Sequence, residues 1–190
     1  MKYKKISFCG SSCTGKTTLI EAMKKDPQFE GWSFFTNVVR DLHKEGREIN
    51  EKSNSETQRM IFDRYNEILS KMFEAPSVAD RCIIDVAAFT SVLFDQMAIG
   101  DEDFIDMSTE EFFQRKEVIR RKDDLSLLVY TPIEFPVEND GERLVDELLR
   151  ESFDQKIQQI LKNSDIPHLR VTGTVEQRMM QIKEVVFSEK

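Results

Sequence analysis

The sequence predicts an α/β domain built on a parallel β-sheet, and three observations favour this class. Short apolar runs alternate along the chain with longer segments of helical hydrophobic spacing. The first apolar run leads through a glycine-containing turn directly into an amphipathic helix. The composition, 39% hydrophobic and 33% charged, is typical of a globular protein and not of a disordered one. A chain of 190 residues fits one domain, residues 1–190.

Five apolar runs are predicted to form strands, because each is short and is followed by a turn signal or a helical pattern. The most apolar of them, at 125–130, is predicted to be buried on both faces. The predicted strands are residues 5–9, 32–36, 76–80, 125–130 and 168–171.

The helices are predicted from apolar residues that recur at spacings of three and four. Serine or threonine followed by Gln or Glu three positions later predicts a capping box at the start of three of them. These boxes are Ser55 with Gln58, Ser108 with Glu111, and Thr174 with Gln177. The predicted helices are residues 16–25, 55–73, 82–97, 108–122, 143–162 and the segment after 174, with a turn or helix at 38–45.

Charge and cysteine content exclude several classes of protein. A net charge of −8 argues against a generally cationic surface for nucleic acid or anionic membrane. Apolar runs are too short to span a bilayer, and the N-terminal run is too short for a signal peptide. An odd number of unpaired cysteines (Cys9, Cys13 and Cys82) predicts reduced thiols in a cytoplasm. With only His43 and His168 beside them, a structural zinc site is not expected.

A phosphate-binding loop is the strongest motif in the chain. Residues 10–17, Gly-Ser-Ser-Cys-Thr-Gly-Lys-Thr, match G-x-x-x-x-G-K-[ST] between a strand and a helix. Two glycines let the backbone curl so that its N–H groups point at an anion. Lys16 is expected to reach the β- and γ-phosphates of ATP, and Thr17 to ligate Mg²⁺. The predicted nucleotide-binding residues are Gly10, Ser12, Cys13, Thr14, Gly15, Lys16, Thr17 and Thr18.

An acidic residue at the end of another strand is also required, to hold hydrated Mg²⁺ or to handle the proton of the acceptor. Asp80, at the end of the third predicted strand, is the best candidate. Arg81 is placed to meet a phosphate or the acceptor, and Asp85 would face the same way if a helix begins after Arg81. The alternative interpretation is an ordinary Asp–Arg ion pair at the surface.

A second group of polar residues, Asn37, Arg40 and Asp41, follows the second predicted strand. Ligands of α/β sheets bind beyond the carboxyl ends of the strands, so this segment is a candidate acceptor site. An equally good interpretation is a solvated first turn of a helix.

A third group lies near the start of the fifth long predicted helix. Arg143 and Arg150 are two turns apart and would point the same way. Placed on a lid at about 134–152, they would neutralise charge on the transferring phosphoryl group. A solvent-exposed charged helix explains the spacing equally well.

The pattern as a whole resembles a known group of small P-loop kinase-like ATPase domains. That group includes the nicotinamide riboside kinase domain of bacterial NAD regulators, and stand-alone bacteriophage kinases are related to it. The resemblance is carried by Asp80-Arg81, Asp85 and Ala88-Phe89, by Asp140-Gly141-Glu142-Arg143 with Arg150, and by the ending 171–178. It implies a five-stranded parallel sheet wrapped by helices, kinase chemistry, and a mobile lid carrying Arg143 and Arg150. The group often has Glu near the position of Asn37.

Three functions are compatible with these motifs. The leading one is a kinase that moves the γ-phosphate of ATP to a nucleoside or nucleotide. The second makes DNA the acceptor, at an end or at a hydroxymethylated base such as hydroxymethyluracil, and would need a basic groove. The one basic cluster, Arg115, Lys116, Arg120, Arg121 and Lys122, is better explained as a solvated helix end. The third is an ATPase switch or binding module, and the absence of an N-K-x-D motif disfavours a GTP switch.

Overall fold

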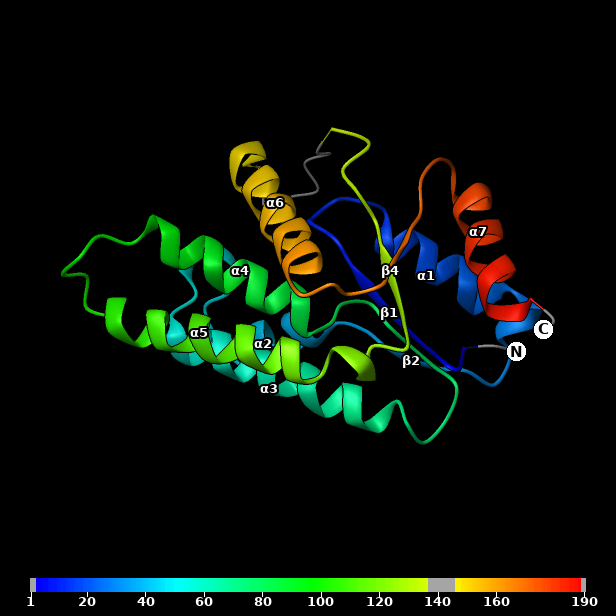
Figure 1. The fold of residues 1–190 in the computed structure, drawn as a ribbon, viewed down its shortest axis with the longest axis horizontal. Coiled ribbons are helices and arrows are strands. Elements are labelled where there is room, and N and C mark those ends of the chain that lie inside the picture. Colours follow the sequence, from blue (N-terminus) through cyan, green and yellow to red (C-terminus); the bar gives the residue numbers. More distant parts are fainter. Residues whose placement is uncertain (1–2, 137–145, 189–190) are drawn as a thin grey trace.

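A five-stranded, entirely parallel sheet forms the centre of the protein, as a computed structural model describes for residues 3–136 and 146–188 (Figure 1). The strand order is β2-β3-β1-β4-β5, so β1 lies in the middle. Ile6 of β1 is in register with Val78 of β3 on one side and Leu127 of β4 on the other. The strands are β1 Lys5–Cys9, β2 Ser33–Phe35, β3 Ser77–Ala79, β4 Leu127–Tyr130 and β5 Leu169–Arg170.

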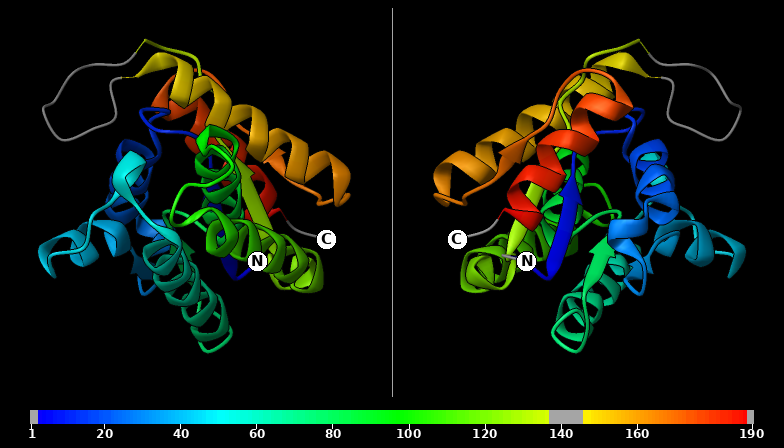
Figure 2. Two further views of the ribbon diagram at one scale, coloured as in Figure 1. Left: turned by 90° about the vertical axis from the view of Figure 1, so that its left-hand side faces the viewer. Right: turned by 90° about the vertical axis from the view of Figure 1, so that its right-hand side faces the viewer.

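Helices cover both faces of the sheet (Figures 1 and 2). Alternate residues of β1 and β4 point into two separate apolar cores. One core lies beneath α1 and α7, and the other beneath α3, α4 and α6. The helices within the described residues are α1 Lys16–Lys25, α2 Val38–Lys44, α3 Ser55–Lys71, α4 Ile83–Gln96, α5 Phe104–Arg120, α6 Glu147–Asn163 and α7 Val175–Phe187.

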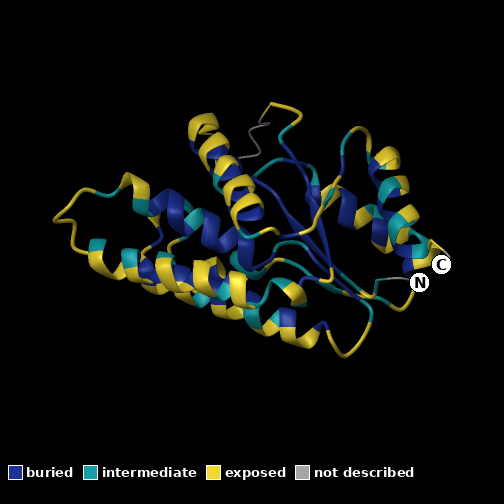
Figure 3. Ribbon diagram, in the orientation of Figure 1, coloured by how far each residue is buried: buried dark blue, intermediate teal, exposed yellow. Residues whose placement is uncertain are grey.

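The predicted fold class and the predicted strands are therefore confirmed, with shorter ends for four of the five strands. The central strands and most of α4 are buried, whereas α5 and α6 have exposed outer faces (Figure 3). No helix within the described ranges is both long enough and apolar enough to cross a membrane.

One of the three predicted capping boxes is confirmed. Thr174 Oγ1 accepts a hydrogen bond from the N–H of Gln177 at 3.3 Å, and Gln177 Oε1 accepts one from the N–H of Thr174 at 2.9 Å. This cap accounts for the polar turn after β5.

The other two predicted boxes are wrong. Asn54 caps α3 by accepting a hydrogen bond from the N–H of Thr57 at 2.9 Å, so Ser55 is already inside the helix. Helix α5 begins at Phe104, four residues before Ser108. Its first residue follows Asp103, whose carboxylate accepts hydrogen bonds from the N–H and hydroxyl of Ser55. Helix α3 is thus capped locally one residue earlier than predicted, and the Ser55 hydroxyl donates to Asp103 at the start of the other helix.

Candidate nucleotide and acceptor site

The P-loop, residues 10–17, joins β1 to α1 at the carboxyl edge of the sheet. Gly10 has φ +149°, and a Cβ there would overlap the side chain and carbonyl oxygen of Thr131. Only glycine fits so close an approach. Thr131, directly after β4, fixes the loop. Its hydroxyl donates to the carbonyl oxygen of Cys9 at 3.2 Å and shares a hydrogen bond of 2.9 Å with Thr14 Oγ1, in which either oxygen could be the donor.

Two buried arginines hold the outside of the loop. Arg150 donates from Nε to the carbonyl oxygen of Ser12 at 2.9 Å and from Nη2 to that of Cys13 at 3.3 Å. Arg178 donates from Nη1 to the carbonyl oxygen of Thr14 at 2.7 Å. In a trans peptide the N–H points opposite to the C=O. Three consecutive carbonyl groups held outward therefore turn three N–H groups toward the other side, where they form a nest for an anion.

The arginines are themselves fixed by further contacts. Arg150 also donates to the carbonyl oxygen of Phe135 at 2.8 Å and forms an ion pair with Glu147. Arg178 donates to the carbonyl oxygen of Gly173 at 3.0 Å and forms an ion pair with Glu134. Both guanidinium groups are almost fully buried.

Arg150 thus lies behind the loop and is not among the residues that line the cavity described below. Its guanidinium donates to carbonyl groups of the loop, which gives it a bracing role, and its contact with a phosphoryl group stays a prediction. Arg143, the other arginine of the predicted lid, lies outside the described residues. Arg178 was not predicted as a site residue, and its only signal was its position in the chain ending that carried the resemblance.

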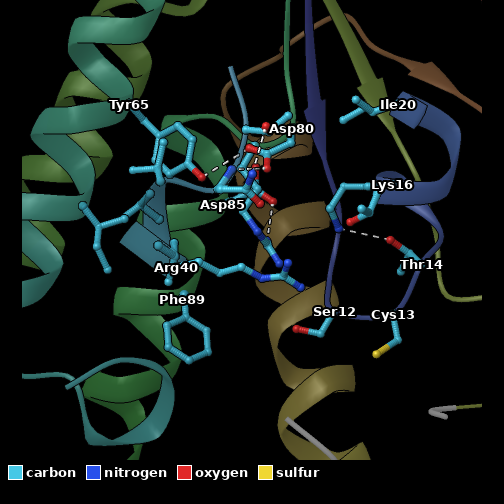
Figure 4. A pocket seen from close by; sticks show the side chains of 18 of the residues that line it. Ser12, Cys13, Thr14, Lys16, Ile20, Arg40, Tyr65, Asp80, Asp85 and Phe89 are labelled. Carbon is cyan, nitrogen blue, oxygen red and sulfur yellow. Dashed lines mark hydrogen bonds and ion pairs between the residues drawn. The ribbon is translucent and has the colours of Figure 1, made fainter. Parts of the chain in front are cut away.

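A cavity of about 270 Å³ opens in front of the loop (Figure 4). Residues 12–18 form one wall, and the predicted residues Asn37, Arg40, Asp80, Arg81 and Asp85 lie on the remaining lining. Figure 4 shows Lys16 and Cys13 on one side and Arg40 and Phe89 on the other.

Asp41 is the predicted acceptor residue that the fold does not bring into this cavity. Its exposed carboxylate accepts from Lys44 at 3.1 Å, one turn along α2, and it does not line the cavity. Asp41 therefore fits the alternative interpretation, a solvated first turn of a helix.

Lys16 is buried at the cavity wall. Its Nζ donates to the carbonyl oxygens of Gly10 and Ser11, both at 2.6 Å, and to Thr14 Oγ1 at 3.1 Å. Burial, followed by the nearby charge of Arg81, lowers the pKa of Lys16 to about 7. The charged form is therefore costly in the ligand-free protein, and an anionic phosphate beside Nζ would stabilise it.

Asp80 follows β3 directly and lies opposite Lys16 in Figure 4. Its Oδ2 accepts from the backbone N–H of Asn37 at 3.1 Å, and its Oδ1 lies 3.5 Å from the hydroxyl of Tyr65. Burial raises the pKa of Asp80 above its usual value. Its carboxylate and the hydroxyl of Thr17 both line the cavity, and they are the donor types with which a P-loop protein holds hydrated Mg²⁺ beside phosphates.

Asp85 lies one turn into α4, and its carboxylate is already committed to neighbouring groups. Oδ1 accepts from the N–H of Gly10 at 3.2 Å and from Arg81 at 3.1 Å, and Oδ2 accepts from the N–H of Cys82 at 3.0 Å. Asp85 therefore ties the first turn of α4 to the P-loop. That network holds Arg81 in the cavity lining.

Several cavity residues escaped the sequence analysis as site residues. They come from α3, α4, α6 and the segment before α3, and they include Ile49, Asn50, Gln58, Tyr65, Phe89 and Phe153. Most lie at helical spacing among apolar neighbours, where core packing is the simplest interpretation. Only Phe89 had a signal, as part of the Ala-Phe pair in the resemblance.

Asn37, a predicted residue of the cavity lining, is in the left-handed region at φ 70°. Its side chain donates to Thr36 Oγ1 at 3.3 Å.

Solved structures with a similar fold include three nucleotide-binding proteins. The NadR protein in complex with NAD and AMP-PNP gives a TM-score of 0.73 at 14% identity, covering 100% of this chain and 51% of that one. This chain thus spans about half the length of NadR. Deoxyadenosine kinase from M. mycoides with bound dATP gives 0.69 at 18% identity, covering 98% and 100%. YorR from Bacillus subtilis with phosphorylated GDP gives 0.54 at 12% identity, covering 96% and 95%.

At these identities the likeness shows a shared fold. The comparison with curated proteins found no match. A family described as an AAA domain matches residues 5–178, a span that begins with β1 and includes the P-loop, Asp80 and Arg178. The chain therefore belongs to this AAA domain family.

Proposed function

We propose that the protein is an ATP-dependent kinase that transfers the γ-phosphate to a hydroxyl group of a nucleoside- or nucleotide-like acceptor. The observation that carries the proposal is one cavity with two chemically different walls. One wall is a P-loop, and the other combines aromatic and amide side chains with Asp80 between them. A cavity that only bound or hydrolysed ATP would have no need of the second wall.

The transfer step is assigned to side chains of this chain. The acceptor hydroxyl oxygen attacks the γ-phosphorus, a P–O bond forms, and the bond from the γ-phosphorus to the β–γ bridging oxygen breaks to release ADP. Asp80 accepts the hydroxyl proton, and its raised pKa brings it nearer to the working range of a general base. Lys16 and Arg81 stabilise the charge that develops on the phosphoryl oxygens. Mg²⁺ would be held by the hydroxyl of Thr17, and by the carboxylate of Asp80 if Asp80 is a metal ligand and not the base. The ion would supply further charge neutralisation.

The similar solved structures support this proposal through what they bind. NadR has been solved with NAD, AMP-PNP and NR, and the M. mycoides enzyme is a deoxyadenosine kinase. The cavity volume of about 270 Å³ suits part of a nucleoside. The side chains of the second wall are expected to select the acceptor.

A DNA acceptor is less well supported. In the basic cluster, Arg115 forms an ion pair with Glu111 at 3.0 Å and Arg120 with Glu117 at 2.5 Å. Arg121 is largely buried and donates to Asp124 at 2.8 Å. These pairs reduce the cationic surface available to a phosphate backbone.

The test is transfer of labelled γ-phosphate from ATP, with magnesium, to a panel of acceptors. The panel holds nucleosides, nucleoside monophosphates, nicotinamide riboside, and DNA with and without hydroxymethyluracil. We expect a labelled small-molecule product that disappears with Asp80→Asn. Labelled DNA would favour the second hypothesis, in which DNA is the acceptor. ATP hydrolysis that releases labelled phosphate but labels no acceptor would support a switch or binding module and overturn the kinase assignment.

A further inference from the structure

Helix α5 exposes an apolar stripe that the other described elements leave exposed, with Lys116 of α5 itself lying over the ring of Phe112 at 4.5 Å. Ile105, Phe112, Phe113 and Ile119 are 76%, 54%, 60% and 55% exposed. Ile105, Phe112 and Ile119 are seven residues apart, so they lie on one face of the helix. The outer surface of α5 is exposed along its length in Figure 3. Four large apolar side chains on one helix face mark an interaction surface.

The opposite face of α5 is already used. Met107, Gln114 and Val118 are buried against the rest of the domain, and Glu110 accepts from Arg59 of α3 at 2.7 Å. The helix is therefore fixed in its orientation, and the apolar stripe cannot turn inward without breaking these contacts. Its cover must come from outside the described domain.

The charges beside the stripe indicate what covers it. Exposed Asp106 lies in the first turn, whereas exposed Lys116 and Arg120 lie in the second half. Arg120 also donates from Nε and Nη2 to Glu117 of its own helix, and its side chain is 70% exposed. Asp106 and Arg120 are each seven residues from Phe113, so the three share one side of the stripe. The face is therefore acidic at its start, apolar in its middle and basic at its end.

We propose that this face is a docking surface for a second copy of the chain, with the two α5 helices antiparallel about a twofold axis near Phe112 and Phe113. Antiparallel pairing places Ile105 beside Ile119 of the second copy. It also places Asp106 beside Arg120 of the second copy, twice in each dimer. A parallel pairing would instead oppose like charges at both ends.

The helix sets the size of the interface. Seventeen residues span roughly 25 Å. A contact made by one helix from each copy is smaller than a standard stable interface, so we expect a dissociation constant on the order of micromolar. None of the four apolar residues lines the cavity, so association is expected to leave ATP binding unchanged.

Analytical ultracentrifugation of the full chain tests the proposal over a wide range of protein concentrations. Wild type is expected to dimerise, and Phe113→Glu to weaken the dimer at least tenfold. The matched control is Met180→Glu, which adds the same charge at a 66% exposed apolar residue on α7 and should leave association unchanged. A wild type that stays monomeric at about 100 μM, or a Met180→Glu variant as weakened as Phe113→Glu, would overturn the proposal.

Charge reversal tests the orientation. Asp106→Arg and Arg120→Asp each place like charges together, so each variant alone should dimerise several-fold more weakly than wild type. Mixing the two variants should restore association, because both contacts in the heterodimer then join opposite charges. No recovery on mixing would rule out the antiparallel arrangement. If the stripe instead binds anionic vesicles or DNA, as shown by cosedimentation and lost in Phe113→Glu, a second copy is not its partner.

Discussion

The two walls of the cavity are built in different ways. The P-loop wall is one continuous segment whose outward carbonyl groups are held by buried side chains from α6 and α7. The opposite wall gathers single side chains from α2, α3, α4 and α6, which lie far apart in the sequence. Its α2 part is largely exposed, and two of its residues, Asn37 and Asn50, have left-handed backbone conformations.

This difference separates two tasks. Backbone N–H groups recognise a phosphate whatever it is attached to, so the loop needs only a fixed shape. Side chains on the second wall recognise the particular acceptor, and they can change without disturbing the loop. Changes to the loop wall should therefore affect every reaction of the protein, whereas changes to the second wall should depend on the acceptor.

The largest expected effect is at Asp80, where the walls meet. Asp80→Asn keeps an oxygen that can accept from the N–H of Asn37 but cannot take a proton. We expect kcat for phosphate transfer to fall roughly 100- to 1,000-fold, with little change in ATP affinity. Asp41→Asn is the matched control, because Asp41 is exposed and outside the cavity. Steady-state kinetics and ATP calorimetry measure both; an active Asp80→Asn would show that the base lies elsewhere.

Removing Arg178, which holds the P-loop from outside, is the next largest expected effect. Arg178→Met leaves the carbonyl oxygens of Thr14 and Gly173 without donors and Glu134 without its partner. We expect a loss of about 2–3 kcal/mol of unfolding free energy, since Glu134 is partly exposed and can be hydrated. ATP affinity should fall as well, because the loop loses its shape.

Arg47→Met is the control for this measurement. Its ion pair with Glu56 is exposed on both sides, so unfolding in urea should change by less than about 0.5 kcal/mol. Equal destabilisation by both variants would mean that Arg178 contributes only as an ordinary surface charge.

The contacts of Arg150 and Arg178 with the P-loop could not be predicted from the sequence. The sheet and the loop were predictable, because hydrophobic periodicity and glycine spacing follow from local backbone geometry. Arg178 donates to a carbonyl group 164 positions away, and any residue supplies such an acceptor, so no sequence pattern predicts this contact. The contacts of Arg150 with the carbonyl oxygens of Ser12 and Cys13 could not be predicted for the same reason.

The failed capping boxes teach a related lesson. A box depends on local hydrogen bonds, yet Asp103 and Ser55 bond to each other across two helices. Ser108 also had the right spacing, but four residues before it Phe104 already begins the helix. In α3 the local cap is Asn54, one residue before Ser55, so a box pattern alone does not fix where a helix begins.

Proton linkage provides a smaller and more specific test of the loop wall. Lys16 has a pKa of about 7 in the ligand-free protein, and bound phosphates should raise it. Above pH 7 the free protein is mainly neutral at Lys16, so ATP binding must take up a proton. Affinity should therefore fall about tenfold per pH unit above 7, until the pKa of the bound form is reached.

Calorimetry in buffers of different ionisation enthalpy measures this uptake. We expect close to one proton at pH 8 and almost none at pH 6. Lys16→Arg, which stays charged at both values, should show no uptake. The lowered pKa also means that the ligand-free fold gains stability as pH rises from about 7 toward 10.5, because the unfolded chain then binds more protons. Uptake that persists in Lys16→Arg would assign the proton to another group.

The smallest effect distinguishes backbone from side chain on the second wall. Asn37 has φ 70°, and its N–H holds Asp80 at 3.1 Å. If this backbone geometry is its contribution, Asn37→Gly should keep the KM for the acceptor, whereas Asn37→Ala should cost about 1 kcal/mol, or about fivefold. If its amide instead binds the acceptor, both variants should raise KM alike while leaving ATP affinity unchanged. Glycine separates the two because it removes the amide and still adopts the left-handed conformation without strain.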